Sequence, residues 1–126
     1  MEESLLIIYC SEGGRKALQK MSSEGFRLPS GVCTFELPCT GRINDVMLME
    51  TLQNGVRGIF VAGCREENCK YLDGNKRALR RIKRIKKLLS DAGIEGKHIE
   101  MQTFGPDEGK RLYSAINDFA GKVGVS

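Results

Sequence analysis

The sequence predicts an α/β fold, a three-layer sandwich built on a four-stranded parallel sheet. Short apolar runs of strand length alternate along the chain with segments of helical periodicity, and glycines or capping residues separate the two kinds of segment. The chain has 126 residues, which is the length of one domain covering residues 1–126. Alternating strands and helices favour a parallel sheet with right-handed crossovers and helices on both faces.

The first strand and helix lie near the amino terminus. Leu5–Tyr9 is a continuous apolar run, which predicts a buried strand, and Gly13-Gly14 predicts a turn into a short helix over Arg15–Met21. Apolar and polar residues mix in Val32–Leu37, which predicts a second strand ending at Pro38.

A second helix and a third strand follow. Asn44 or Asp45 is expected to cap this helix, and Asn54-Gly55 to end it. Its predicted apolar stripe consists of Val46, Met47, Met49 and Leu52. Val56–Ala62 is apolar apart from Arg57 and Gly58, as expected for a strand buried on both faces of a parallel sheet.

The clearest helical periodicity runs from Asn75 to Leu89 and ends before Gly93. Its apolar positions recur every three or four residues: Ala78, Leu79, Ile82, Ile85, Leu88 and Leu89. Its eight cations are expected on the opposite side: Lys76, Arg77, Arg80, Arg81, Lys83, Arg84, Lys86 and Lys87.

A last strand is predicted over Ile99–Phe104, and Asp107 is expected to cap a last helix. The inward positions of that helix would be Leu112, Ile116 and Phe119. The whole order is βαβαβαβα, which fits a flavodoxin-like or Rossmann-like sheet. The order of the strands within the sheet stays open.

The charge and the amino terminus limit the function classes. The net charge is +4, but the eight cations of the basic helix contribute +8, so the rest of the chain carries −4. The start of the chain has no basic segment, and its apolar run is too short for a signal peptide or a membrane span. We therefore expect a cytoplasmic protein without a membrane span.

Four of the five cysteines are expected to meet at one edge of the sheet. Cys10, Cys39 and Cys64 each follow a predicted strand, and Cys69 comes five positions after Cys64. Open α/β proteins bind their ligands at the carboxyl edge of the sheet, so these thiols are candidates for one metal site. Free thiols in a reducing compartment point to metal or redox chemistry before disulfides.

The spacing of the cysteines leaves the metal open between an iron-sulfur cluster and a structural zinc. A Rieske centre is excluded because it needs two histidines, and His98 is the only histidine in the sequence. Cys33 lies inside a predicted strand and is expected to be a small core residue.

The basic helix has three interpretations: a solvated helix face, a nucleic-acid contact, or a surface that docks an acidic protein. The helix has no aromatic residue for stacking on bases, so no nucleic-acid partner is expected.

A sequence pattern in the middle of the chain resembles a known family. The pattern consists of Cys39-Thr40-Gly41-Arg42, Gly63-Cys64, Cys69-Lys70-Tyr71 and Gly74-Asn75, followed by Arg77, Arg80 and Arg81. It resembles the delta subunit of the methyl-viologen-reducing (F420-non-reducing) hydrogenase, a hydrogenase iron-sulfur subunit family, and the similarity extends from Leu5 to about Phe104.

The resemblance implies a subunit that carries a 2Fe-2S cluster as its cofactor. It implies electron transfer from a hydrogenase or formate dehydrogenase to the flavoprotein subunit of a heterodisulfide-reductase-like complex, with Cys10, Cys39, Cys64 and Cys69 at family cysteine positions. Gly13 stands where the family usually has a further cysteine, and Lys70 stands where relatives often have histidine. A structural zinc subunit, or a metal-free subunit that assembles through its basic helix, is the alternative.

Overall fold

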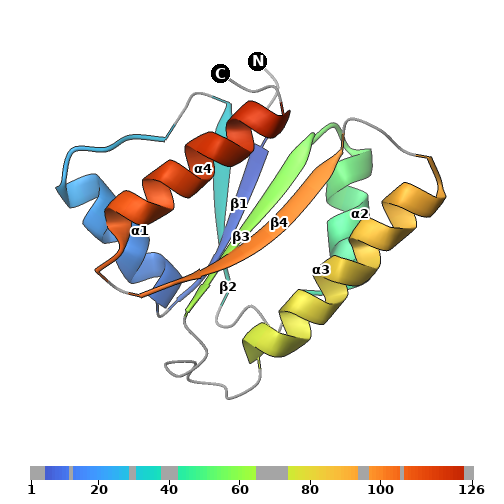
Figure 1. Cartoon of the computed structure of the whole chain (residues 1–126), viewed down its shortest axis with the longest axis horizontal. Helices are drawn as coiled ribbons and strands as arrows, with labels where there is room; N and C mark the ends of the chain where they lie inside the picture. The colour runs from blue at the N-terminus through green and yellow to red at the C-terminus, as the bar shows by residue number, and fades with distance from the viewer. Residues whose placement is uncertain are drawn as a thin grey trace.

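The computed structural model describes residues 5–11, 13–28, 31–37, 43–64, 74–93, 97–105 and 107–123, with the backbone alone for residues 64 and 74–76. Its elements follow the predicted order (Figure 1). They are β1 (Leu5–Cys10), α1 (Gly13–Ser23), β2 (Val32–Leu37), α2 (Asp45–Gln53), β3 (Gly58–Cys64), α3 (Gly74–Asp91), β4 (His98–Phe104) and α4 (Gly109–Val123).

The four strands form one parallel sheet in the order β2-β1-β3-β4. This confirms the α/β class, and the order is that of a flavodoxin-like sheet. Leu5 of β1 is paired with Val32 of β2 on one side and with Gly58 of β3 on the other. The two central strands therefore start and end at nearly the same level.

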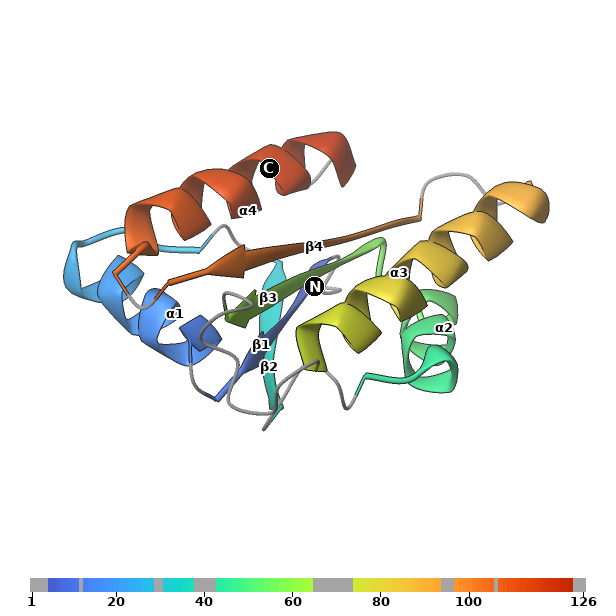
Figure 2. The ribbon, with the colours of Figure 1, turned by 60° about the horizontal axis from the view of Figure 1, so that its bottom comes forward.

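Two helical layers enclose the sheet. Helices α1 and α4 cover one face, and α2 and α3 cover the other (Figures 1 and 2). Along β1, Leu5 and Ile7 pack into the α1/α4 core and Ile8 packs into the α2/α3 core. Both faces of the strand are buried, which explains its continuous apolar run.

Strand β2 differs because it is an edge strand. Its middle residues, Thr34 to Glu36, are exposed, and Phe35 keeps 49% of its surface accessible. Cys33 is only half-buried, so its prediction as a core residue is wrong. An edge strand has a neighbour on one side alone, which leaves its side chains partly open to water.

Helix α2 begins as predicted but buries a different stripe. The Asn44 side chain caps it by accepting a hydrogen bond of 2.8 Å from the Met47 N–H. The buried residues are Leu48 and Leu52, whereas Val46 is 65% exposed, so its predicted place on the inner stripe is wrong. The helix ends at Asn54-Gly55 as expected, with Gly55 at φ +100°.

Helix α3 confirms the strongest periodicity in the sequence. Its buried residues are Ala78, Ile82, Ile85 and Leu89. Leu79 and Leu88, also predicted to face inward, are instead 38% and 48% exposed at the two margins of the buried stripe. Gly93 follows the helix at φ +68°, a backbone conformation that favours glycine.

Helix α4 starts two residues after Asp107, so the prediction of Asp107 as its cap is wrong. Glu108 directly precedes the helix, and its Oε1 accepts a hydrogen bond of 2.7 Å from the Gly105 N–H. The predicted inward residues Leu112, Ile116 and Phe119 are all buried.

Within the described ranges, no helix is both long and apolar enough to span a membrane.

Candidate functional site

The carboxyl edge of the sheet brings together the ends of the three strands that precede the predicted ligands. Cys10 is the last residue of β1, and Cys64 is the last residue of the neighbouring strand β3. Tyr9 pairs with Ala62, so the backbones of Cys10 and Cys64 lie at nearly the same level. Cys10 also pairs with Leu37, two positions before Cys39.

The Cys10 thiol lies buried at the start of helix α1. Its residue is 3% exposed, and its Sγ accepts a hydrogen bond from the Gly14 N–H at 3.1 Å. The first N–H groups of a helix have no partner within the helix, so they are available to a sulfur at this position. Backbone N–H donors of this kind are among the contacts that tune cluster sulfurs.

Gly14 fits between β1 and β3 because it has no side chain. A Cβ atom at this position would lie 2.6 Å from the Ala62 carbonyl oxygen and 3.3 Å from the Cys10 Sγ. The sequence predicted a turn at Gly13-Gly14, but both residues belong to α1. The helix can therefore begin directly against the sheet, with its N–H aimed at the thiol.

Most of the predicted ligand set lies outside the described residues. Cys39 and Cys69 are outside them entirely, and Cys64 is described by its backbone alone. Among the side chains that the structure describes, no three Cys, His, Asp or Glu residues form a group able to hold a metal ion. Of the predicted ligands, Cys10 alone has a described side chain, and its buried thiol, which accepts a backbone N–H, has the chemistry that a cluster ligand needs.

Cys33 lies in the wrong place to replace a ligand at this edge. It is four positions before Leu37 in β2, and a strand rises about 3.3 Å per residue, so it lies about 13 Å from the strand's end. Cys33 therefore does not share the carboxyl edge with Cys10.

A polar group next to Cys10 joins the ends of β1 and β2. The Ser11 hydroxyl donates to Glu36 Oε2 at 2.7 Å, and the Ser11 N–H donates to the Leu37 carbonyl oxygen at 2.8 Å. Desolvation raises the pKa of Tyr9, and the negative charge of Glu36 raises this pKa further. No sequence pattern signals this group, because only the pairing of the two strands brings Glu36 to Ser11.

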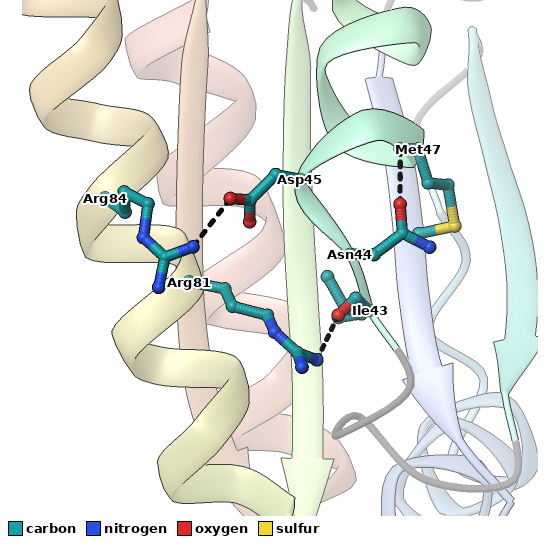
Figure 3. Close-up of polar contacts among 6 residues, drawn as sticks. All are labelled: Ile43, Asn44, Asp45, Met47, Arg81 and Arg84. Atoms are coloured by element: carbon teal, nitrogen blue, oxygen red, sulfur yellow. Dashed lines mark hydrogen bonds and ion pairs between the residues drawn. The ribbon is translucent and has the colours of Figure 1, made fainter.

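The cations of helix α3 differ in their contacts and in their exposure. Arg81 and Arg84 face α2, where Arg81 Nη1 donates to the Ile43 carbonyl oxygen and Arg84 pairs with Asp45 at 2.8 Å (Figure 3). Arg81 is half-buried, so its placement opposite the core is wrong. The exposed cations among the described side chains of α3 are Arg77, Arg80, Lys83, Arg84, Lys86 and Lys87.

Two shallow hollows lie away from Cys10. One, of about 480 Å³, is lined by the carboxyl end of α3 and the start of β4, including the half-buried His98. The other, of about 600 Å³, lies between the end of α1 and β2. Neither hollow includes a residue of the carboxyl edge.

Comparison with known families identifies the family of the chain. A family model described as the delta subunit of methyl-viologen-reducing hydrogenase matches residues 5–124. The chain belongs to this family.

Relatives in this family have similar lengths. The chain is 31% identical over 118 residues to an iron-sulfur subunit of the F420-non-reducing hydrogenase of Archaeoglobus profundus, covering 94% of this chain and 86% of the relative. It is 32% identical over 118 residues to the corresponding iron-sulfur subunit of the F420-non-reducing hydrogenase vhu of Methanopyrus kandleri, covering 93% and 89%.

A third relative is much larger. The chain is 31% identical over 93 residues to one subunit of the ferredoxin/F(420)H(2)-dependent CoB-CoM heterodisulfide reductase of Methanosarcina acetivorans. These residues are 74% of this chain and only 12% of that protein. The family therefore includes separate hydrogenase subunits, and a related segment occurs within a heterodisulfide reductase subunit.

Proposed function

We propose that this chain is a cytoplasmic electron-transfer subunit that holds a 2Fe-2S cluster with Cys10, Cys39, Cys64 and Cys69. It relays electrons from a hydrogenase or formate dehydrogenase type donor to the flavoprotein subunit of a heterodisulfide-reductase-like complex. The observation that carries the proposal is the buried Cys10 thiol at the carboxyl edge, with the Gly14 N–H directed at its sulfur.

The described residues support this assignment in three ways. Strands β2, β1 and β3 are neighbours whose carboxyl ends share one edge, and three of the four cysteines end or follow these strands in the sequence. Gly14 allows the start of α1 to lie close to β3, because the Cβ of any other residue would meet the Ala62 carbonyl oxygen. The similarity to iron-sulfur subunits of hydrogenases and to a segment of a heterodisulfide reductase supports both the cofactor class and the partners.

The cluster supplies one-electron chemistry, and the chain supplies its setting. Cys10, a buried residue, would provide one thiolate. The Gly14 N–H donates to the Cys10 sulfur, and a donor of this kind favours the more negative, reduced state. Electron transfer does not require the side chains around Cys10 to make or break covalent bonds.

The test is anaerobic reconstitution with iron and sulfide of five single variants: Cys10→Ser, Cys39→Ser, Cys64→Ser, Cys69→Ser and Cys33→Ser. Wild type and Cys33→Ser are expected to bind about two iron and two sulfide per chain. Each of the other four variants is expected to lose most of the iron. Full iron content in Cys64→Ser or Cys69→Ser would refute the ligand assignment, and loss in Cys33→Ser would move a ligand to β2.

A further inference from the structure

Helix α3 carries a row of cations that the fold does not use. Arg80, Lys83 and Lys87 are exposed and follow one another at spacings of three and four residues, so they form one stripe along the helix. We call these three residues the outward stripe. At 100° per residue, the stripe lies opposite the buried residues Ile82 and Leu89.

The contrast with the other arginines of α3 defines the stripe. Arg81 and Arg84 are directed at α2, where they contact the Ile43 carbonyl and the Asp45 carboxylate (Figure 3). In the part of the chain that the structure describes, the three side chains of the outward stripe make no ion pair. Helix α3 is therefore attached to the protein by one set of cations and presents another set to solvent.

The outward stripe does not serve the stability of the helix. Like charges spaced three or four residues apart repel one another and destabilise a helix. Arg80 and Lys83 lie three residues apart in the outward stripe, and Lys83 and Lys87 lie four residues apart. Such a row is best explained by a partner of opposite charge.

The surroundings of the stripe favour a protein partner over a nucleic acid. Leu79 and Leu88 flank the stripe and are 38% and 48% exposed. Exposed apolar side chains next to cations can pack against a protein partner, whereas stacking on bases needs aromatic side chains, which α3 lacks. In the Methanosarcina acetivorans relative, a segment similar to this chain is part of a heterodisulfide reductase polypeptide, which favours a partner of that type.

We propose that the outward stripe docks against an acidic surface of the heterodisulfide-reductase-type flavoprotein. This inference rests on the proposed function and adds the surface and its chemistry. Helix α3 starts at the carboxyl edge of the sheet, and Arg80 lies about 9 Å along it from Gly74. A partner on the stripe is therefore held beside the edge that contains Cys10.

The test compares two triple variants of the full, reconstituted chain. Arg80→Gln/Lys83→Gln/Lys87→Gln removes the outward stripe, and Lys16→Gln/Lys20→Gln/Arg27→Gln removes the same number and type of exposed cations beside the opposite layer. The probe is the purified flavoprotein of the heterodisulfide-reductase type from the same organism, and Kd is measured by calorimetry at low and high salt.

The Kd of the outward-stripe variant is expected to be about tenfold higher than that of wild type at low salt. At high salt the ratio of the two Kd values is expected to be smaller, because salt screens exposed charge pairs. The control variant is expected to stay within about twofold of wild type. Equal weakening in both variants, no weakening in either, or no binding of wild type would overturn the proposal.

Two further measurements separate the possible failures. Iron content and visible spectrum are expected to be unchanged in the outward-stripe variant, and its melting temperature unchanged or higher, because a repulsion is removed. Loss of the cluster from all samples, with binding retained, would refute the proposed function but not the docking surface. Binding of a DNA duplex of about 24 base pairs through the stripe, without flavoprotein binding, would assign the surface to nucleic acid instead.

Discussion

The two helical layers of this protein are held to the sheet in different ways. In the α1/α4 layer the two helices approach so closely that a Cβ on Gly109 would overlap the Met21 backbone nitrogen. In the α2/α3 layer the helices share an aliphatic core, and two arginines of α3 join them through polar contacts. One layer depends on close packing, and the other depends partly on charge.

Under the proposed function, the two layers would have different roles in electron transfer. The α1/α4 layer includes the start of α1, where Gly14 fits closely against β3 and its N–H contacts the Cys10 sulfur. The α2/α3 layer places its remaining cations on the surface, where they can meet an acidic partner. The comparison suggests that one layer shapes the site and that the other faces the partner.

The largest expected effect concerns the contact between α1 and α4. Gly109→Ala forces a methyl group onto the α1 backbone and is expected to lower the free energy of unfolding by about 3 kcal/mol. The matched control is Gly121→Ala in the same helix, where a Cβ meets nothing within 4 Å. That variant is expected to raise stability by roughly 0.5–1 kcal/mol. Urea denaturation measures the free energy of unfolding of both variants. Equal changes in Gly109→Ala and Gly121→Ala would mean that α1 and α4 are not closely packed at Gly109.

A second substitution tests the start of α1. Gly14→Ala places a Cβ against the Ala62 carbonyl and is expected to cost about 2 kcal/mol. It also moves the N–H away from the Cys10 sulfur, so the reduction potential of the reconstituted protein is expected to fall. Gln19→Ala, on the exposed side of α1, is the control and should change neither quantity. An unchanged potential in Gly14→Ala would show that this N–H does not tune the site.

A third pair of variants tests the polar contacts of the α2/α3 layer. Arg81→Ala removes a donor from the Ile43 carbonyl and is expected to cost about 1–2 kcal/mol. Arg84→Ala breaks an exposed ion pair with Asp45 and is expected to cost at most about 0.5 kcal/mol, falling with added salt. Denaturation at two salt concentrations measures the stability that each variant loses. If the stability lost in Arg81→Ala depended on salt, the assignment of its main contact to the Ile43 carbonyl would be contradicted.

The smallest expected effect concerns pH at the carboxyl edge. Because desolvation and Glu36 raise the pKa of Tyr9, folded Tyr9 keeps its proton at a pH where the unfolded chain has begun to lose it. Tyr9 therefore stabilises the fold below pH about 10, and this contribution is lost as the pH rises through its folded pKa. Glu36→Gln is expected to lower the Tyr9 pKa, which ultraviolet titration against Tyr9→Phe would detect. An unchanged Tyr9 pKa in Glu36→Gln would show that Glu36 does not raise this pKa.

Most of the fold could be predicted because its periodicities are strong. The stripe of α3 follows from Ala78, Ile82, Ile85 and Leu89, and the strands β1 and β3 follow from runs buried on both faces. The order of the strands could not be predicted, since an apolar run does not specify its neighbours. The exposure of Phe35 and Cys33 depends on β2 being at the edge.

The candidate site was predicted in part. The position of Cys10 at a strand end was visible in the sequence. The inclusion of Gly13-Gly14 in α1 was not, because glycine disfavours helix and its reason here is the approach of β3. The link between Ser11 and Glu36 depends on strand pairing across 25 positions.

The most direct test of the central claim is metal analysis of the chain purified without oxygen, with electron paramagnetic resonance after reduction by dithionite. We predict about two iron and two sulfide per chain, and a signal from one unpaired electron in the reduced sample. One zinc per chain, or a folded sample without metal, would contradict the electron-carrier assignment and would favour a structural role.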